Sequence, residues 1–192
     1  MTLVSDILDF WFGAPGSPGR GQFRDAWFRK DPDFDNEIRR NFLEATEAAA
    51  RGEHDRLQAD LRGTLALVIL LDQFPRNLYR GQAKAFAADP KARVVADQAL
   101  ARGFDRELVP CERLFFYLPF EHSETLADQE RSVALFRSLA GEEAWLEKGL
   151  EAALKHLHII QRFGRFPHRN PALGRETTAD EAEFLKQPGS SF

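Results

Sequence analysis

The stretch TLALVILLDQ, residues Thr64–Gln73, places seven consecutive apolar residues between polar ends. A helix with apolar side chains all round has to be surrounded by other elements, so we expect this segment at the centre of the fold. Pro75 is expected to end the helix, because the residue before a proline disfavours the helical conformation. The sequence therefore predicts a central helix that ends close to Asp72.

Apolar residues recur at spacings of three and four through most of the chain, which favours helices. Thr2 or Ser5 is expected to cap the first helix, Gly52 and Gly164 to follow two others, and Thr178 and Glu181 to form a capping box. Gly13–Gly21 is expected to be a loop. The expected helices are Leu3–Phe12, Pro32–Arg51, Thr64–Gln73, Pro90–Arg102, a segment from Pro110 that Pro119 breaks, Thr125–Ala140, Glu142–Phe163 and a short one after Thr178. About seven to nine helices with short loops predict an all-α fold of stacked antiparallel hairpins.

Composition and charge narrow the class of protein. A length of 192 residues fits a single domain, residues 1–192, and a net charge of −4 does not favour nucleic acid. The apolar runs are too short to span a membrane, and the first six residues do not resemble a signal peptide. Cys111 is the only cysteine, so no internal disulfide can form. We therefore expect a soluble cytoplasmic protein.

Three apolar segments each end in a dense group of polar residues, Asp72–Asn77, Glu121–Glu124 and Gly164–Asn170. The words Phe-Pro-Arg-Asn and Phe-Pro-His-Arg-Asn occur in the first and third groups, and each is followed by a further arginine. Two copies of one helix-end arrangement explain this recurrence. We expect the three groups to lie on one side of the protein and to line one concave polar pocket.

Asp72 is expected at the C-terminal end of a helix, where the helix dipole disfavours a negative charge. An uncompensated carboxylate beside a buried run is costly, so Asp72 requires a partner such as Arg76, Arg169 or a histidine. Two interpretations stay open at this point. Asp72 is either half of a structural ion pair or part of a binding site.

Helical projections place some polar residues on apolar faces. They predict that Asp128, Gln129 and His156 are mostly buried and that His158 is exposed. Buried side chains of this kind have to be hydrogen-bonded, which is also the simplest explanation of a lone buried histidine. Polar residues outside the three groups, on two of the expected helices, therefore also need partners inside the protein.

Metal and nucleophile chemistry receive little support. Glu121-His122-Ser123-Glu124 lacks the spacing of helical metal ligands, so no metal or cofactor is expected. None of the common nucleophile and phosphate-loop motifs occurs. Cys111 follows Pro110 at a helix N-terminus, a position that can lower the pKa of a thiol.

Taken together, Asp9–Phe12, Leu71–Asn77, Leu118–Glu124 with Asp128-Gln129, and Phe163–Asn170 resemble the domain-of-unknown-function 924 family. The resemblance covers nearly the whole chain. It implies an all-helical fold similar to the tetratricopeptide-like superhelices. It implies no activity and no catalytic residue, because no activity is established for the family.

Three hypotheses on function follow. The first is a small anionic ligand or substrate in a polar pocket, the second a tetratricopeptide-like module that binds a peptide or protein, and the third a purely structural role for the polar groups. No nucleic-acid or membrane partner is expected, and the sequence does not give the oligomeric state. The candidate ligand-binding residues are Asp72, Arg76, Asn77, Glu121, His122, Glu124, Asp128, Gln129, His156, Arg165, His168, Arg169, Asn170 and Arg175.

Overall fold

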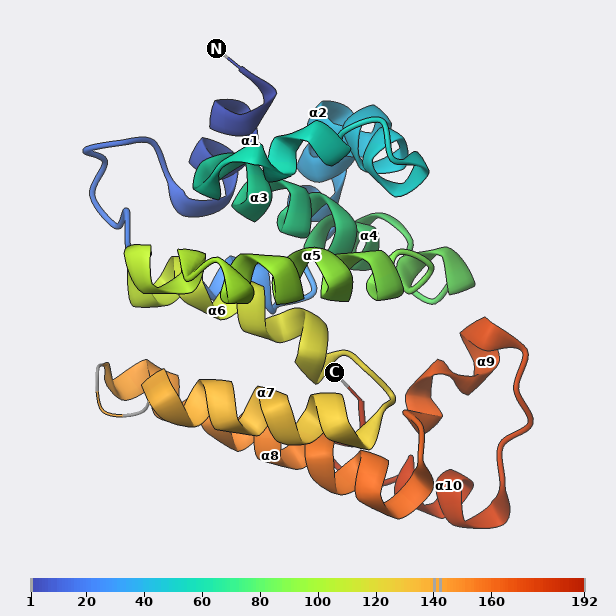
Figure 1. Ribbon diagram of the computed structural model, residues 1–192. Helices are drawn as coiled ribbons and strands as arrows, with labels where there is room; N and C mark the ends of the chain where they lie inside the picture. The colour runs from blue at the N-terminus through green and yellow to red at the C-terminus, as the bar shows by residue number, and fades with distance from the viewer. Residues whose placement is uncertain (1, 140, 142, 192) are drawn as a thin grey trace.

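The computed structural model describes residues 2–139, 141 and 143–191, and within these ranges it contains helices and no strand (Figure 1). This confirms the prediction of an all-α fold, whereas the tetratricopeptide-like superhelix stays a prediction. The helices are α1 Leu3–Phe12, α2 Pro32–Arg51, α3 Leu61–Val68, α4 Phe74–Leu78, α5 Asp89–Ala101, α6 Pro110–Glu121, α7 Leu126–Leu139, α8 Ala144–Phe163, α9 Asn170–Leu173 and α10 Ala179–Phe184.

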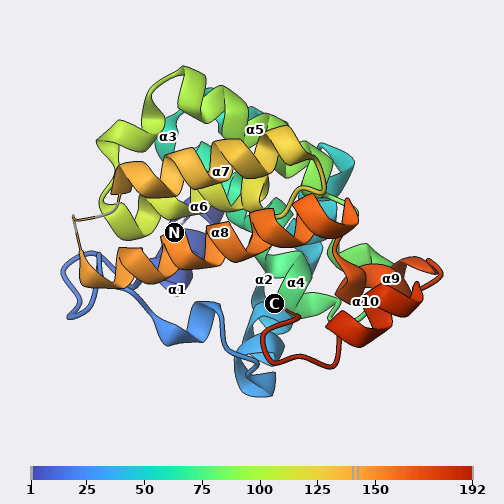
Figure 2. The ribbon, with the colours of Figure 1, turned by 90° about the horizontal axis from the view of Figure 1, so that it is seen from below.

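Helix α3 lies at the centre, as its composition predicts. Every residue from Leu65 to Leu71 is fully buried, and α3 contacts α1, α5 and α6. Helices α7 and α8 lie side by side along much of their length in both views (Figures 1 and 2). The core is therefore built around α3, and the α7–α8 pair packs beside α6.

The prediction that Pro75 ends the central helix is wrong. A π-helical turn, Ile69–Gln73, joins α3 to α4, and the amide of Phe74 donates to the carbonyl of Ile69 five residues earlier. Pro75 then lies in the first turn of α4, where its missing N–H is not needed. Asp72 is thus inside a continuous helical rod, not at a helix end, and π-turns of this kind are frequent at functional sites.

The prediction that Pro119 breaks its helix is also wrong, because α6 continues to Glu121. A proline inside a helix removes one backbone hydrogen bond and costs about 3 kcal/mol or more. The side chains from Leu114 to Phe120 are almost completely buried. Burial of each large apolar side chain stabilises the fold by about 1.5–3 kcal/mol, which together outweighs the proline.

Several predicted helix ends are confirmed. The Thr2 side chain caps α1, left-handed Gly52 and Gly164 follow α2 and α8, and Thr178 forms a capping box with Glu181 at α10. The predicted boundaries at Ala140 and Glu142 lie outside the described residues. Local capping chemistry therefore determines most helix ends in this chain.

The helical projections are confirmed for three residues. Gln129 and His156 are buried and His158 is exposed. Asp128 is only half-buried, because it lies at the edge of α7, where the Arg93 side chain reaches it at 3.1 Å. The projections thus identified the buried faces of α7 and α8 correctly, but they overestimated the burial of Asp128 at the edge of the α7 face.

Cys111 does not have the lowered pKa that its position at a helix N-terminus suggested. The thiol is buried, and burial together with Glu112 raises its pKa to about 12. Desolvation disfavours the thiolate more than the first turn of a helix favours it. Separately, none of the described helices is long and apolar enough to cross a bilayer.

Candidate functional site

The π-turn, the end of α6 and the 3-10 turn Pro167–Arg169 meet in one place. The imidazole Nδ1 of His122 lies 2.7 Å from Oδ1 of Asp72, and Arg169 donates from Nη1 to the carbonyl oxygen of His122 at 3.0 Å. Glu124 accepts a hydrogen bond from the backbone amide of Phe166 at 2.8 Å. The structure thus brings together side chains from all three polar groups.

Asp72 is fully buried and surrounded by donors. Gln73 donates to its Oδ2 at 2.5 Å, and Nη1 of Arg76 lies 3.3 Å from its Oδ1. Burial by itself raises the pKa of this carboxyl group, but Arg76 and His122 outweigh burial and hold the pKa at about 2. Asp72 is therefore a carboxylate at neutral pH, with the partners that its burial requires.

His122 is oriented by Asp72. A carboxylate only accepts hydrogen bonds, so Nδ1 carries the hydrogen and Nε2 keeps its lone pair when the ring is neutral. Burial and then the charge of Arg76 lower the pKa of the imidazole. Within the described residues no hydrogen bond to Nε2 occurs, and 13% of the side chain is exposed.

Two arginines share one carboxylate that sequence analysis missed. Arg76 binds Asp89 through two hydrogen bonds of 2.9 and 3.0 Å, and Nη1 of Arg169 lies 3.6 Å from Asp89 Oδ2. Asp89 precedes Pro90 at the start of α5, where an acidic residue is expected for helix stability alone. Its sequence position therefore gave no signal of this contact.

Arg169 is the least saturated cation of the cluster. Its guanidinium lies 4.6 Å from the ring centre of Phe86 and 4.5 Å from that of Phe166. The side chain is 7% exposed, and its buried Nε has no hydrogen-bond partner among the described residues. Burial and Arg76 lower its pKa to about 10, which still leaves it charged at neutral pH.

Glu121, His156 and His168 complete the interior of the cluster. Oε1 of Glu121 lies 3.3 Å from Nδ1 of His156, and burial together with Asp72 raises the pKa of Glu121 to about 8. Burial lowers the pKa of His156 to about 3 and that of His168 to about 4. At neutral pH these three residues are therefore mostly uncharged.

Other predicted site residues are engaged in holding the segment after α8. Arg175 binds Glu124 at 2.7 and 3.0 Å and Asn170 at 2.9 Å. Arg165 binds Glu181 at 2.6 and 2.8 Å. These paired side chains attach the C-terminal segment to the end of α6 and to α10.

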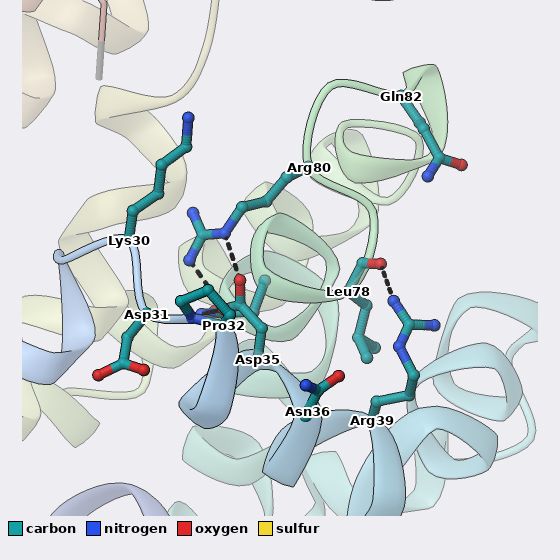
Figure 3. A pocket seen from close by; sticks show the side chains of 10 residues that line it. Lys30, Asp31, Pro32, Asp35, Asn36, Arg39, Leu78, Arg80 and Gln82 are labelled. Carbon is teal, nitrogen blue, oxygen red and sulfur yellow. Dashed lines mark hydrogen bonds and ion pairs between the residues drawn. The ribbon is translucent and has the colours of Figure 1, made fainter.

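Asn77 faces a different part of the molecule. Its amide donates to Asp35 at 2.7 Å, and Arg80 binds the same carboxylate at 2.6 and 2.9 Å. This pair borders an open hollow of about 560 Å³ between α2 and the end of α4, shown in Figure 3. Asn77 is therefore not part of the cluster around Asp72.

Gln129 and Asp128 also have defined partners. The amide nitrogen of Gln129 donates to the carbonyls of Glu121 and Ser123, both at 2.6 Å, so Gln129 caps the C-terminus of α6. Asp128 accepts from the hydroxyl of Ser123 at 2.6 Å. Both residues hold the α6–α7 turn, which positions His122.

Truncation of Gln129 to alanine is expected to lower the free energy of unfolding by about 1–3 kcal/mol, because it leaves buried carbonyls without a donor. Urea unfolding followed by circular dichroism measures this change. Gln98→Ala is the matched control, since Gln98 is exposed on α5 and its loss should cost less than about 0.5 kcal/mol. Equal costs for the two variants would contradict the capping role.

Among the described residues, no group of three or more His, Cys, Asp or Glu side chains is arranged so that it could hold a metal ion. The cluster instead combines the ionised carboxylate of Asp72, two arginines, the oriented neutral imidazole of His122 and the buried protonated carboxyl group of Glu121. Such a set can bind an anion and move protons.

Comparison with known proteins shows the family of this chain. A family model described as bacterial protein of unknown function, DUF924, matches residues 7–189. The chain is also similar to the solved structure of a protein of unknown function from Agrobacterium tumefaciens, with 45% identity and a TM-score of 0.84. That similarity covers 96% of this chain and 97% of the other. No curated protein matches. The chain therefore belongs to the DUF924 family of bacterial proteins of unknown function.

Proposed function

We propose that this protein binds a small anionic ligand beside His122 and Arg169, and that His122 acts on this ligand as a general base. The observation that carries the proposal is the contact of 2.7 Å between the buried Asp72 carboxylate and Nδ1 of His122. It fixes the tautomer that leaves Nε2 available as a proton acceptor.

The electrostatics of His122 support a base at neutral pH. Burial and Arg76 lower its pKa, so the imidazole is mostly neutral in the free protein. The negative charge of Asp72 stabilises the imidazolium that forms when Nε2 accepts a proton. The His122 side chain is 13% exposed, which gives a ligand access from solvent.

The arginines support an anionic ligand. Arg76 and Arg169 are balanced in formal charge by Asp72 and Asp89, but Arg169 reaches Asp89 only at 3.6 Å. Its buried Nε has no protein partner among the described residues, and a guanidinium fork is well suited to a carboxylate or phosphate group. Arg165 and Arg175, in contrast, are saturated by protein groups, which favours a structural role for them.

The proposed setting is the cytoplasm. A single buried cysteine is compatible with a reducing compartment. A small metabolite with a carboxylate or phosphate group is the class of ligand that fits the arginines.

Arg169→Ala is expected to weaken the binding of inorganic phosphate at least tenfold, because a charged hydrogen bond contributes about 1.5–3 kcal/mol. Isothermal titration calorimetry with phosphate, sulfate, acetate and oxalate measures the affinities. Arg165→Ala is the matched control, since it removes a saturated arginine from the same segment and should change binding less than twofold.

Arg169→Lys separates binding from folding, because lysine keeps the charge and loses the planar fork. Thermal unfolding of each variant shows whether the fold is retained. The proposal is wrong if none of the four anions binds the wild-type protein, or if Arg165→Ala weakens binding as much as Arg169→Ala.

A further inference from the structure

The geometry points to Glu121 as a second acid–base residue of the His122 site, a neutral carboxylic acid that donates its proton to a group bound beside His122. This inference rests on the function proposed above and adds a proton donor to it. The inference depends on the neighbours of the Glu121 side chain, on its burial and on its buried Oε2 atom.

Glu121 is the last residue of α6 and immediately precedes His122. Its side chain is 5% exposed, and its Oε2 is buried without a hydrogen-bond partner among the described residues. A buried polar atom of this kind destabilises the fold when nothing binds it. This oxygen can therefore form a hydrogen bond with a bound molecule, because no described residue supplies one.

His156 does not neutralise Glu121 as an imidazolium would. Its Nδ1 lies 2.9 Å from the carbonyl oxygen of Ala152, and a carbonyl only accepts, so Nδ1 carries the hydrogen. Burial holds the pKa of His156 at about 3, so the ring is neutral across the physiological range. The interaction at 3.3 Å thus joins a neutral imidazole to Glu121 and supplies no compensating charge.

Several charged or titratable groups act on Glu121, on His156 or on the adjacent His122. They come from the π-turn, α4, α6, α8 and the turn Pro167–Arg169, and they are Asp72, Arg76, His122, His156, His168 and Arg169. Helix α7 contributes the uncharged Gln129. Both arginines are held by Asp89 and by backbone carbonyls, so the negative charge of Asp72 dominates at Glu121.

The two carboxyl groups of the cluster therefore hold different protonation states. Asp72 has a pKa of about 2 and is ionised, whereas Glu121 has a pKa of about 8 and keeps its proton at neutral pH. Environments that separate two carboxyl pKa values in this way are typical of acid–base pairs in enzymes. Asp72 orients the base, and Glu121 is the acid.

Protons balance in an acid–base step that uses His122 and Glu121. Nε2 of His122 takes one proton from the bound molecule, and Glu121 gives one proton to the atom of that molecule that gains negative charge. This leaves an imidazolium at His122 and a carboxylate at Glu121. Transfer of one proton from His122 to Glu121 through water restores both groups without any further reactant.

Nuclear magnetic resonance of the His122 imidazole tests the inference in the free protein. In the wild type its chemical shifts should show an inflection near pH 8, caused by the ionisation of Glu121. Glu121→Gln keeps the size of the side chain and should abolish this inflection. Glu130→Gln, an exposed glutamate on α7, is the matched control and should retain it.

A missing inflection in the wild type, or one that persists in Glu121→Gln, overturns the inference. If Glu121→Gln does not fold, the carboxyl carbon of Glu121 in the wild type gives the same pKa directly, and an ordinary value overturns it. Inorganic phosphate should move the inflection to higher pH, since a bound anion disfavours ionisation. If phosphate binds but does not move the inflection near pH 8, the role of Glu121 as proton donor is overturned. If phosphate does not bind at all, the proposed anion site is contradicted instead.

Discussion

Asp72→Ala is expected to lower the free energy of unfolding at pH 7 by about 3–5 kcal/mol. The carboxylate is fully buried and contacts His122, Gln73 and Arg76, so its loss removes one of the two carboxylates, Asp72 and Asp89, that pair with Arg76. Removal of one partner from a buried charge cluster costs far more than removal of an exposed ion pair. Chemical unfolding at pH 7 measures the difference.

The sign of its pH dependence follows from the lowered pKa. Because the pKa falls from 3.8 to about 2 on folding, Asp72 stabilises the protein above about pH 4 and loses this contribution as the pH falls toward 2. The difference between wild type and Asp72→Ala should therefore shrink in acid. Asp97→Ala, which removes an exposed partner of Arg131, is the control and should cost less than about 1 kcal/mol. Similar costs for both variants would contradict the central place of Asp72.

Glu121→Gln is expected to flatten the dependence of stability on pH. Folding raises the pKa of Glu121 from 4.5 to about 8, so the folded protein keeps a proton that the unfolded chain loses. The stability linked to this group is full below about pH 4.5 and is lost as the pH rises to about 8, with a slope of about 1.4 kcal/mol per pH unit. Between pH 5 and 8 the wild type should therefore lose about 4 kcal/mol that the variant retains.

Denaturant unfolding of both proteins from pH 5 to pH 8.5 measures these slopes. All other titratable groups are present in both proteins, so the difference between the two curves isolates Glu121. Glu130→Gln should follow the wild-type curve, because its side chain is exposed on α7. Parallel curves for wild type and Glu121→Gln would show that Glu121 is ionised normally in the folded protein.

Local chemistry in the sequence determined much of the fold. The caps at Thr2 and Thr178 and the glycines Gly52 and Gly164 give helix ends that depend on neighbouring residues only. The apolar run Leu65–Leu71 gave the central helix in the same way. Such features can be read from one segment, because their free energy arises within that segment.

Helical periodicity also identified most of the polar cluster. It placed Gln129 and His156 in the interior, and the polar ends of the apolar runs pointed to Asp72 and His122. It overestimated the burial of Asp128, which lies at the edge of the buried face of α7 and is half-buried. The period of a helix fixes the direction of a side chain, but the neighbouring element decides how far that side is covered.

Tertiary packing decided the rest. Pro119 does not end its helix, because burial of the surrounding side chains outweighs the lost backbone hydrogen bond. Pro75 does not end the helical rod, because it follows a π-turn and lies in the first turn of α4, where its missing N–H is not needed. Packing also joined Asp89 to both arginines and turned Asn77 toward Asp35, away from the cluster. Contacts between residues far apart in the chain depend on how whole helices pack, so the protonation states of Asp72 and Glu121 were set by the tertiary structure and not by their local sequence.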